Sequence, residues 1–202
     1  MLDAIKHGLS NLFNPNGRDA RQAFWYYVLF IYLLTMAISM VVIMPVTMQS
    51  VMTGVQQGIE AGRGQDPAAA QAAVQASMLT SMSQIFPAMM WVSMITGIIM
   101  LVGLGASFVR RLHDSGLSSY WALLPAACQI VSLAAVPSQL TRIQESIQSM
   151  DLRNPLAGFA MMQGSFGIGP LLAWAAIGIV VALGVRKSMP GPNRFGDAPF
   201  VA

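Results

Sequence analysis

The chain is dominated by four long stretches without charged side chains, which are separated by polar segments. Each stretch exceeds the roughly 20 residues that an α-helix needs to cross the hydrocarbon core of a bilayer. Apolar and polar residues do not alternate at period two, so helices fit these stretches and the strands of a membrane barrel do not. The pattern predicts an all-α membrane protein with four transmembrane helices, at residues 24–48, 85–109, 120–140 and 166–185.

The apolar periodicity continues past three of the predicted membrane ends. After the first span, apolar residues recur at heptad-like intervals, at Met48, Met52, Val55 and Ile59. Gln, Ser, Ala and Thr lie between such positions, and these residues suit water better than lipid. We expect two helical hairpins, packed as a four-helix bundle, whose outer halves extend beyond the membrane to tips near residues 60–66 and 151–155. Disorder of these Ala- and Gln-rich stretches is the alternative.

The N-terminal segment predicts a short amphipathic helix at residues 1–13. Its apolar positions share one helical face, at Leu2, Ile5, Leu9, Leu12 and Phe13. Lys6 and His7 lie elsewhere, so the helix is expected to rest on the membrane surface with its apolar face in the lipid. An unstructured tail is the alternative, because short helices are marginal alone.

Composition and charge support a membrane protein and give its orientation. Hydrophobic residues make up 55% of the 202 residues and charged residues only 9%, far below the roughly 25% charged residues of a soluble domain. One side of the predicted membrane receives eight of the eleven Lys and Arg residues, namely Lys6, Arg18, Arg21, Arg110, Arg111, Arg186, Lys187 and Arg194. This side is therefore expected to be the cytoplasm, with both termini and the tail at 186–202. The net charge of +3 then reflects topology and attraction to anionic lipid rather than nucleic acid.

Three polar clusters fall on the predicted cytoplasmic face. They are NPNGRDARQAFW (14–25), RRLHDSGLSSYW (110–121) and MPGPNRFGDAP (189–199). If they converge, they form a candidate site for an anion or a lipid headgroup, because Arg groups favour phosphate. The candidate residues are Arg18, Arg21, Arg110, Arg111, His113, Asn193 and Arg194.

Local rules offer a purely structural interpretation of the second cluster. Arg110 and Asp114 are spaced i, i+4 and are expected to form an ion pair that closes the second span. Gly116 would then end that helix, and Ser118 or Ser119 would cap the third span. The structural and the ligand-binding interpretations are compatible, because one Arg could pair internally and also meet lipid.

At these clusters the sequence resembles the domain of unknown function 805 family, a family of small bacterial inner-membrane proteins. The resemblance rests on GRxxRxxFW before the first span, RRLHDxG followed by an aromatic pair, and GPNxxG near the C-terminus. Ser119 and Tyr120 depart from the Gly and Trp that the family tends to show, and the outer hairpins are longer. The resemblance implies a bacterial inner-membrane location and a four-span plan. It implies no biochemical activity.

The inventory of reactive residues argues against an enzyme. His113 and Asp114 are adjacent, and adjacent helical side chains point about 100° apart, so they do not easily share a ligand. The chain has two His and one Cys, and lacks an HExxH motif, a GxSxG elbow and a phosphate-binding GxxxxGK[ST] loop. We expect no catalytic residue, no metal site and no cofactor.

Two function classes remain from the sequence. We expect a non-enzymatic interaction or scaffold protein over a single domain, residues 1–202. Its expected partners are membrane lipids, including anionic phospholipid, and another membrane or envelope protein or a second copy of the chain. The alternative is a small transporter or channel subunit that acts as an oligomer. This alternative is weaker, because transporters usually carry ionisable residues in mid-membrane and the four predicted spans carry none.

Overall fold

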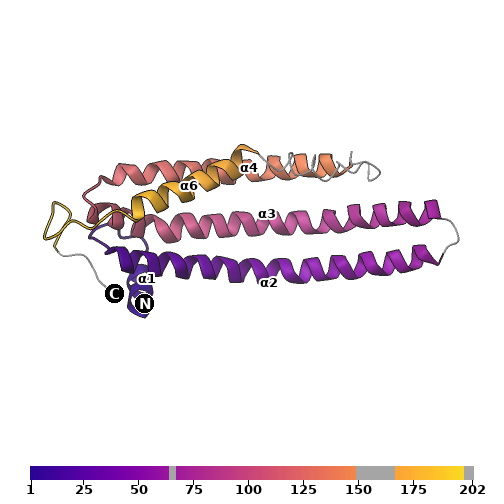
Figure 1. Cartoon of the computed structure of the whole chain (residues 1–202), viewed down its shortest axis with the longest axis horizontal. Helices are drawn as coiled ribbons and strands as arrows, with labels where there is room; N and C mark the ends of the chain where they lie inside the picture. The colour runs from indigo at the N-terminus through magenta and orange to yellow at the C-terminus, as the bar shows by residue number, and fades with distance from the viewer. Residues whose placement is uncertain (64–66, 149–166, 198–202) are drawn as a thin grey trace. The chain divides into compact units, whose positions relative to one another are not determined.

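A computed structural model describes residues 1–63, 67–148 and 167–197 of the chain, and these residues form helices joined by turns and loops without a named strand. The helices are α1 (Leu2–Ser10), α2 (Arg21–Gly62), α3 (Pro67–Asp114), the 3₁₀-helix η1 (Ser119–Ala122), α4 (Leu123–Gln148) and α6 (Ile168–Gly184) (Figure 1). The all-α class predicted from the sequence is confirmed for the described residues.

Three helical segments are long and apolar enough to cross a membrane, namely Arg21–Glu60, Ile85–Asp114 and Ser119–Ile143. They coincide with the first three predicted spans. Helix α6 is apolar but has only 17 residues, about 26 Å of helix against a hydrocarbon core of about 30 Å. The chain is therefore a membrane protein by its helices, and the fourth span stays a prediction.

The described parts of the outer stretches are helical, as the heptad-like spacing predicts. Helix α2 continues to Gly62 and α4 to Gln148, and α3 begins at Pro67, the position at which proline suits the start of a helix. Helix α2 thus extends into the first predicted tip at 60–66, of which residues 64–66 lie outside the described residues. The second predicted tip, at 151–155, lies outside them altogether.

The N-terminal helix α1 is shorter than the predicted 1–13. It ends at Ser10, because Asn11 leaves the helical conformation (φ −111°, ψ 32°) and its side-chain Nδ2 donates to the carbonyl of His7 at 3.0 Å. Leu2 and Phe13 expose more than three quarters of their surface, as expected for a segment with a lipid-facing side. On the buried side, Gly8 packs against the ring of Tyr27.

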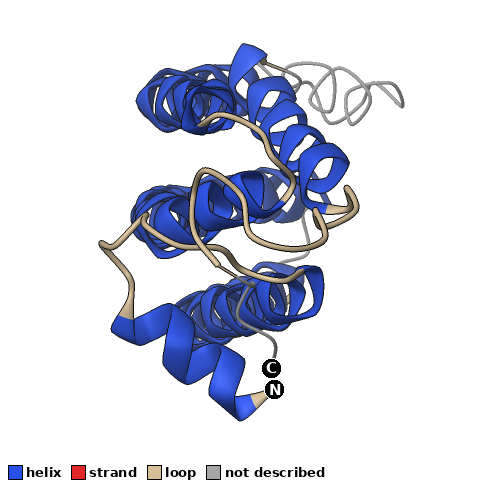
Figure 2. Cartoon of the chain, turned by 90° about the vertical axis from the view of Figure 1, so that its left-hand side faces the viewer, coloured by secondary structure: helices blue, strands red, loops and turns tan. Residues whose placement is uncertain are grey.

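The chain divides into two compact units. The first contains residues 1–37, 95–135 and 168–202, and the second contains residues 38–94 and 136–167. In the first unit, the loop between α1 and α2, the turn after α3 and the segment after α6 gather at one end of the helices (Figures 1 and 2). The described residues of the three polar sequence clusters lie in these loops and in the adjoining helix ends.

The core of the first unit lies directly beneath the gathered loops. Phe24 of α2 and Phe108 and Leu112 of α3 are buried at its centre. The partly buried residues around them come from α2, the turn after α3, η1 and α6, namely Trp25, Val28, Leu117, Ala122, Val180 and Leu183. Apolar packing therefore fixes the end of α3 that presents the RRLHD run.

In the second unit, α2 buries a polar position and exposes an apolar face. Ser50 is 3% exposed, and its carbonyl accepts a hydrogen bond of 3.3 Å from Ser81 Oγ of α3. On the side of α2 away from Ser50, apolar side chains that are each more than half exposed form what we call the outer stripe, namely Val41, Met44, Met48, Val51, Met52, Val55 and Ile59.

Candidate functional site

The three polar clusters meet in the first unit and form a buried network of charged side chains. Its charged members, none more than 5% exposed, are Arg18, Asp19, Arg110, Arg111 and Asp114. Three guanidinium groups thus face two carboxylates. Buried charges persist only when they are paired and hydrogen-bonded, and the network divides into two clusters, each built around one aspartate.

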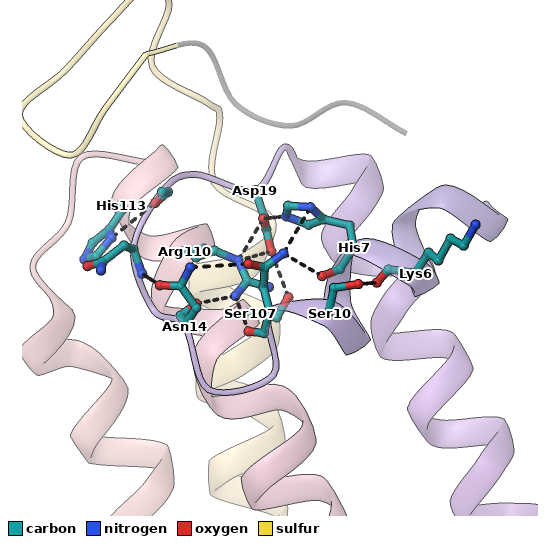
Figure 3. Close-up of polar contacts among 11 residues, drawn as sticks. Lys6, His7, Ser10, Asn14, Asp19, Ser107, Arg110 and His113 are labelled. Atoms are coloured by element: carbon teal, nitrogen blue, oxygen red, sulfur yellow. Dashed lines mark hydrogen bonds and ion pairs between the residues drawn. The ribbon is translucent and has the colours of Figure 1, made fainter.

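The first cluster surrounds Asp19 (Figure 3). Arg110 Nε donates to both carboxylate oxygens of Asp19, at 3.0 Å each, and Ser107 Oγ donates at 3.0 Å. His7 Nε2 lies 3.1 Å from Asp19 Oδ1, so α1 is tied to the same carboxylate. Arg110 Nη1 donates to the carbonyls of Asn11 and Asn14, at 2.8 and 2.6 Å. This cluster therefore fixes α1 and the loop after it to α3.

The second cluster surrounds Asp114 at the end of α3. Arg18 Nη2 donates to Asp114 Oδ1 at 3.1 Å, and Arg111 Nη1 donates to Asp114 Oδ2. The sequence-based ion pair between Arg110 and Asp114 is therefore wrong. Asp114 pairs instead with Arg111, one residue closer along the helix, and with Arg18, while Arg110 pairs with Asp19.

Arg18 and Arg111 also fix the segment that follows α6, mainly through backbone carbonyls. Arg18 donates to the carbonyls of Met189, Gly191 and Asp197, at 2.7, 2.6 and 2.9 Å. Arg111 donates to the carbonyl of Gly184 at 3.0 Å, to the carbonyl of Arg186 and to Ser188 Oγ at 3.3 Å. Two arginines thus hold a stretch of backbone across the end of α3.

His113 lies between the turn after α3 and the C-terminal segment. Its Nδ1 is 3.3 Å from the carbonyl of Gly17, and its Nε2 is 2.7 Å from Ser119 Oγ. The ring stacks on Phe195 with a centroid distance of 3.9 Å and an interplanar angle of 6°. His113 is only 7% exposed, so its two nitrogens and one ring face are occupied by structural contacts.

The GPNxxG motif forms a tight turn that places Phe195 on His113. Asn193 and Gly196 exchange two backbone hydrogen bonds, at 3.0 and 3.1 Å, and Gly196 has a φ of 137°, a conformation that suits glycine. Asn193 Oδ1 accepts from the backbone N–H of Phe195 at 2.9 Å, and Asn193 Nδ2 donates to the carbonyl of His113 at 2.9 Å. The motif therefore has a structural explanation.

The local predictions for the turn after α3 are confirmed. Helix α3 ends at Asp114, and Gly116 has a φ of 76°, which suits a glycine just past a helix end. The side chain of Ser118 accepts from the backbone N–H of Tyr120 and caps η1, which precedes α4. The sequence predicted that Ser118 or Ser119 is the cap. Ser118 has this role, and Ser119 contacts His113.

Two of the predicted site arginines lie outside the buried network. Arg21 is exposed at the start of α2, and no hydrogen bond or ion pair joins it to the network within the described residues. Arg194 is also exposed, and its guanidinium carbon lies 4.6 Å from the centre of the Phe195 ring. The predicted anion site thus separates into buried arginines with internal partners and exposed basic residues.

Four side chains that belong to the network or bond to it were not among the sequence-based candidates, namely His7, Asp19, Ser107 and Ser188. Asp19 could have been predicted from the sequence, because the three polar clusters hold few acidic residues and buried arginines need anionic partners. His7, Ser107 and Ser188 could not, since they lie outside those clusters. Among the described residues, no three His, Cys, Asp or Glu side chains converge as metal ligands do.

Three helical segments are apolar and long enough to span a membrane. A buried charged network joins the loops of the first unit. Together these features define a helical membrane protein whose polar motifs hold its loops together. The sequence comparison agrees with this class and narrows it. Residues 12–197 match the family described as "Protein of unknown function (DUF805)", and the chain belongs to that family. No curated protein and no solved structure matches the chain.

Proposed function

We propose that this protein is a non-enzymatic scaffold of the bacterial inner membrane, whose cytoplasmic face binds the phosphates of anionic phospholipids. The observation that carries the proposal is the burial of the arginines and aspartates of the three motifs. A catalytic group must reach its substrate, whereas Arg110, Arg111 and Asp114 are at most 2% exposed. Arg111 and Asp114 pair with each other, and Arg110 pairs with Asp19. This arrangement supports a structural role for the motifs.

The lipid contacts are assigned to the exposed basic residues rather than to the buried arginines. Five basic side chains of the first unit are exposed, namely Lys6, Arg21, Arg186, Lys187 and Arg194. Basic residues near a membrane surface attract anionic headgroups by roughly 1 kcal/mol each. Helix α1 adds exposed apolar side chains such as Leu2 and Leu9 next to Lys6, the combination that binds a helix to an anionic surface.

The proposed topology has four spans with both termini in the cytoplasm. Helix α6 serves as the fourth span in this arrangement, because its 17 residues are uniformly apolar and no charged residue lies between 154 and 185. A slightly short span is accommodated by local thinning of the bilayer at modest cost. Four spans return the segment after α6 to the side of the membrane that holds α1, which fits their shared network in the first unit.

Thermal unfolding with added lipid tests the headgroup contacts. The purified full chain in a neutral detergent is expected to gain several degrees in Tm with phosphatidylglycerol and little with phosphatidylcholine. Replacing Arg21, Arg186 and Lys187 together by Gln is expected to remove more than half of this difference. The matched control is Arg63→Gln, which removes an exposed charge from the second unit's α2 end and should leave the lipid preference unchanged.

Two outcomes would contradict the lipid assignment. An equal Tm gain with both lipids would show that binding does not depend on the charge of the headgroup. An equal gain with inorganic phosphate alone would move the ligand from a lipid to a soluble anion. A turnover of lipid or of a phosphate ester by the purified protein would overturn the non-enzymatic part of the proposal.

A further inference from the structure

The outer stripe of α2 presents more apolar surface than membrane lipid can cover. Helix α2 has 42 residues, about 63 Å at 1.5 Å per residue, and the hydrocarbon core is about 30 Å thick. With the Arg21 end at the cytoplasmic surface, the core is crossed before Met48. Met52, Val55 and Ile59 then project beyond the lipid, and each is more than half exposed.

In this part of α2, the outer stripe lies beside the exposed polar side chains of Gln49 and Gln56. Ser50 faces α3 and is buried, and Gln57 follows it seven residues later on the same side. The outer stripe lies on the opposite side. A water-facing helix normally carries polar residues over its outward face, so a continuous outward stripe of exposed apolar side chains favours a protein surface as its cover.

We infer that the outer stripe is a homodimer interface, in which α2 of one copy packs against α2 of a second copy. This inference rests on the proposed interaction role of the protein and names its partner. Val41, Met48, Met52, Val55 and Ile59 occupy the inward positions of a heptad pattern, with steps of seven, four, three and four residues. Ser50 and Gln57 then occupy the position farthest from the seam, which is the side that α3 covers.

The area of the stripe matches what a stable dimer needs. Its seven side chains are between 53% and 74% exposed and together offer roughly 700 Å² on each copy, close to the ~800 Å² per partner of a standard protein interface. Unbranched methionine side chains adapt to a facing surface, and three of the seven are Met.

The absence of charge on the stripe favours an identical partner. No Asp, Glu, Lys or Arg occurs between Arg21 and Glu60, so two copies of the stripe do not repel each other. A two-fold dimer brings the same patch of both copies together, and an uncharged apolar patch is complementary to itself. A highly charged partner would find no complementary charge here.

Cysteine cross-linking in native membranes tests the dimer with the full chain. In a Cys128→Ser background, Met52→Cys, Val55→Cys and Ile59→Cys place single thiols on the stripe. Gln57→Cys is the matched control, on the same helix but on the side of Ser50. Mild oxidation is expected to give a disulfide-linked dimer at least fivefold more from the stripe positions than from position 57.

A second variant tests whether the apolar side chains of the stripe cause the cross-linking. Combining Met52→Gln and Val55→Gln with Ile59→Cys is expected to lower the cross-linked fraction at least threefold, with an unchanged Tm of the detergent-dissociated monomer. Equal cross-linking at positions 57 and 59, or cross-linking only to a protein of different mass, would overturn the inference. The lipid-dependent Tm difference reports on the headgroup contacts separately, so a failed dimer and a failed lipid site are distinguishable.

Discussion

At the scale of single residues, the network depends on two ion pairs that join the first motif to the second. Arg18 and Asp19 are neighbours in the first motif, and each pairs with a residue of opposite charge in the second, Asp114 and Arg110 respectively. Each motif alone would hold an unpaired buried charge. The two motifs are therefore stable only together, because an uncompensated charge in a protein interior is costly.

Asp114→Asn is expected to destabilise the protein strongly. It removes the carboxylate that Arg18 and Arg111 share and leaves three buried guanidinium groups facing one acid. Removing one partner of a buried ion pair costs about 3–5 kcal/mol, which lowers the Tm of a chain of this size by on the order of 10 °C. Thermal unfolding of the purified variant measures the effect.

The control for this prediction is Asp3→Asn, which removes the same charge from an exposed position in α1. It should leave the Tm within about 2 °C of the parent, since exposed substitutions are usually worth less than 0.5 kcal/mol. An equally small change for Asp114→Asn would refute the pairing seen in the structure.

The sequence could predict the turn after α3 but not the pairing of its charges. Gly116 and Ser118 follow from rules that involve only neighbouring residues, and both behave as those rules require. The i, i+4 rule also favoured Arg110 with Asp114, and it failed because Asp19, 91 residues away, takes the Arg110 guanidinium. A local rule contains no information on a partner that only the tertiary fold brings near.

At the scale of the helices, α6 is positioned by a close approach to α2. A Cβ on Gly184 would lie 2.9 Å from Phe24 Cε1 and 3.3 Å from Trp25 Cζ2, whereas a Cβ on Gly178 of the same helix would meet no atom within 4 Å. Gly184 also supplies the carbonyl that Arg111 Nε binds. The same residue therefore allows the helix contact and takes part in the network.

The two glycines of α6 give a matched pair of substitutions. Gly184→Ala is expected to destabilise the protein by about 1–3 kcal/mol, because the added methyl overpacks the aromatic contact. Gly178→Ala should be neutral or stabilising by up to about 1 kcal/mol, since alanine favours the helix and has open space. Thermal unfolding of both variants compares them, and equal Tm values would contradict the packing of α6 on Phe24.

Helix positions were predictable because the apolar stretches are long and uninterrupted by charge. The first three predicted spans lie within α2, α3 and the η1–α4 segment, and the heptad-like spacing anticipated the length of α2. The end of α1 was misplaced, because Asn11 leaves the helical conformation with a side-chain hydrogen bond that apolar spacing does not reveal. Periodicity thus located the helices, and side-chain caps set their limits.

At the scale of the whole molecule, the proposed topology places Arg63 and Lys187 on opposite sides of the membrane. Both positions are exposed. In a Cys128→Ser background, Arg63→Cys is expected to react with a membrane-impermeant thiol reagent on intact spheroplasts. Lys187→Cys should react only after the membrane is opened. Labelling of both positions on intact spheroplasts would place Lys187 outside the cytoplasm. That result would exclude the proposed topology of four spans with both termini in the cytoplasm.

The hydrogen bonds of Arg18 have a consequence for the synthesis of the chain. Its acceptor at Asp197 lies 179 residues further along the chain, so at about 5–20 residues per second the ribosome needs roughly 9–36 s to deliver it. During that interval Arg18 is present without its three carbonyl partners at Met189, Gly191 and Asp197. The first loop therefore reaches its final state only after Asp197 has been made, and a chain that terminates before Met189 keeps Arg18 without these three acceptors.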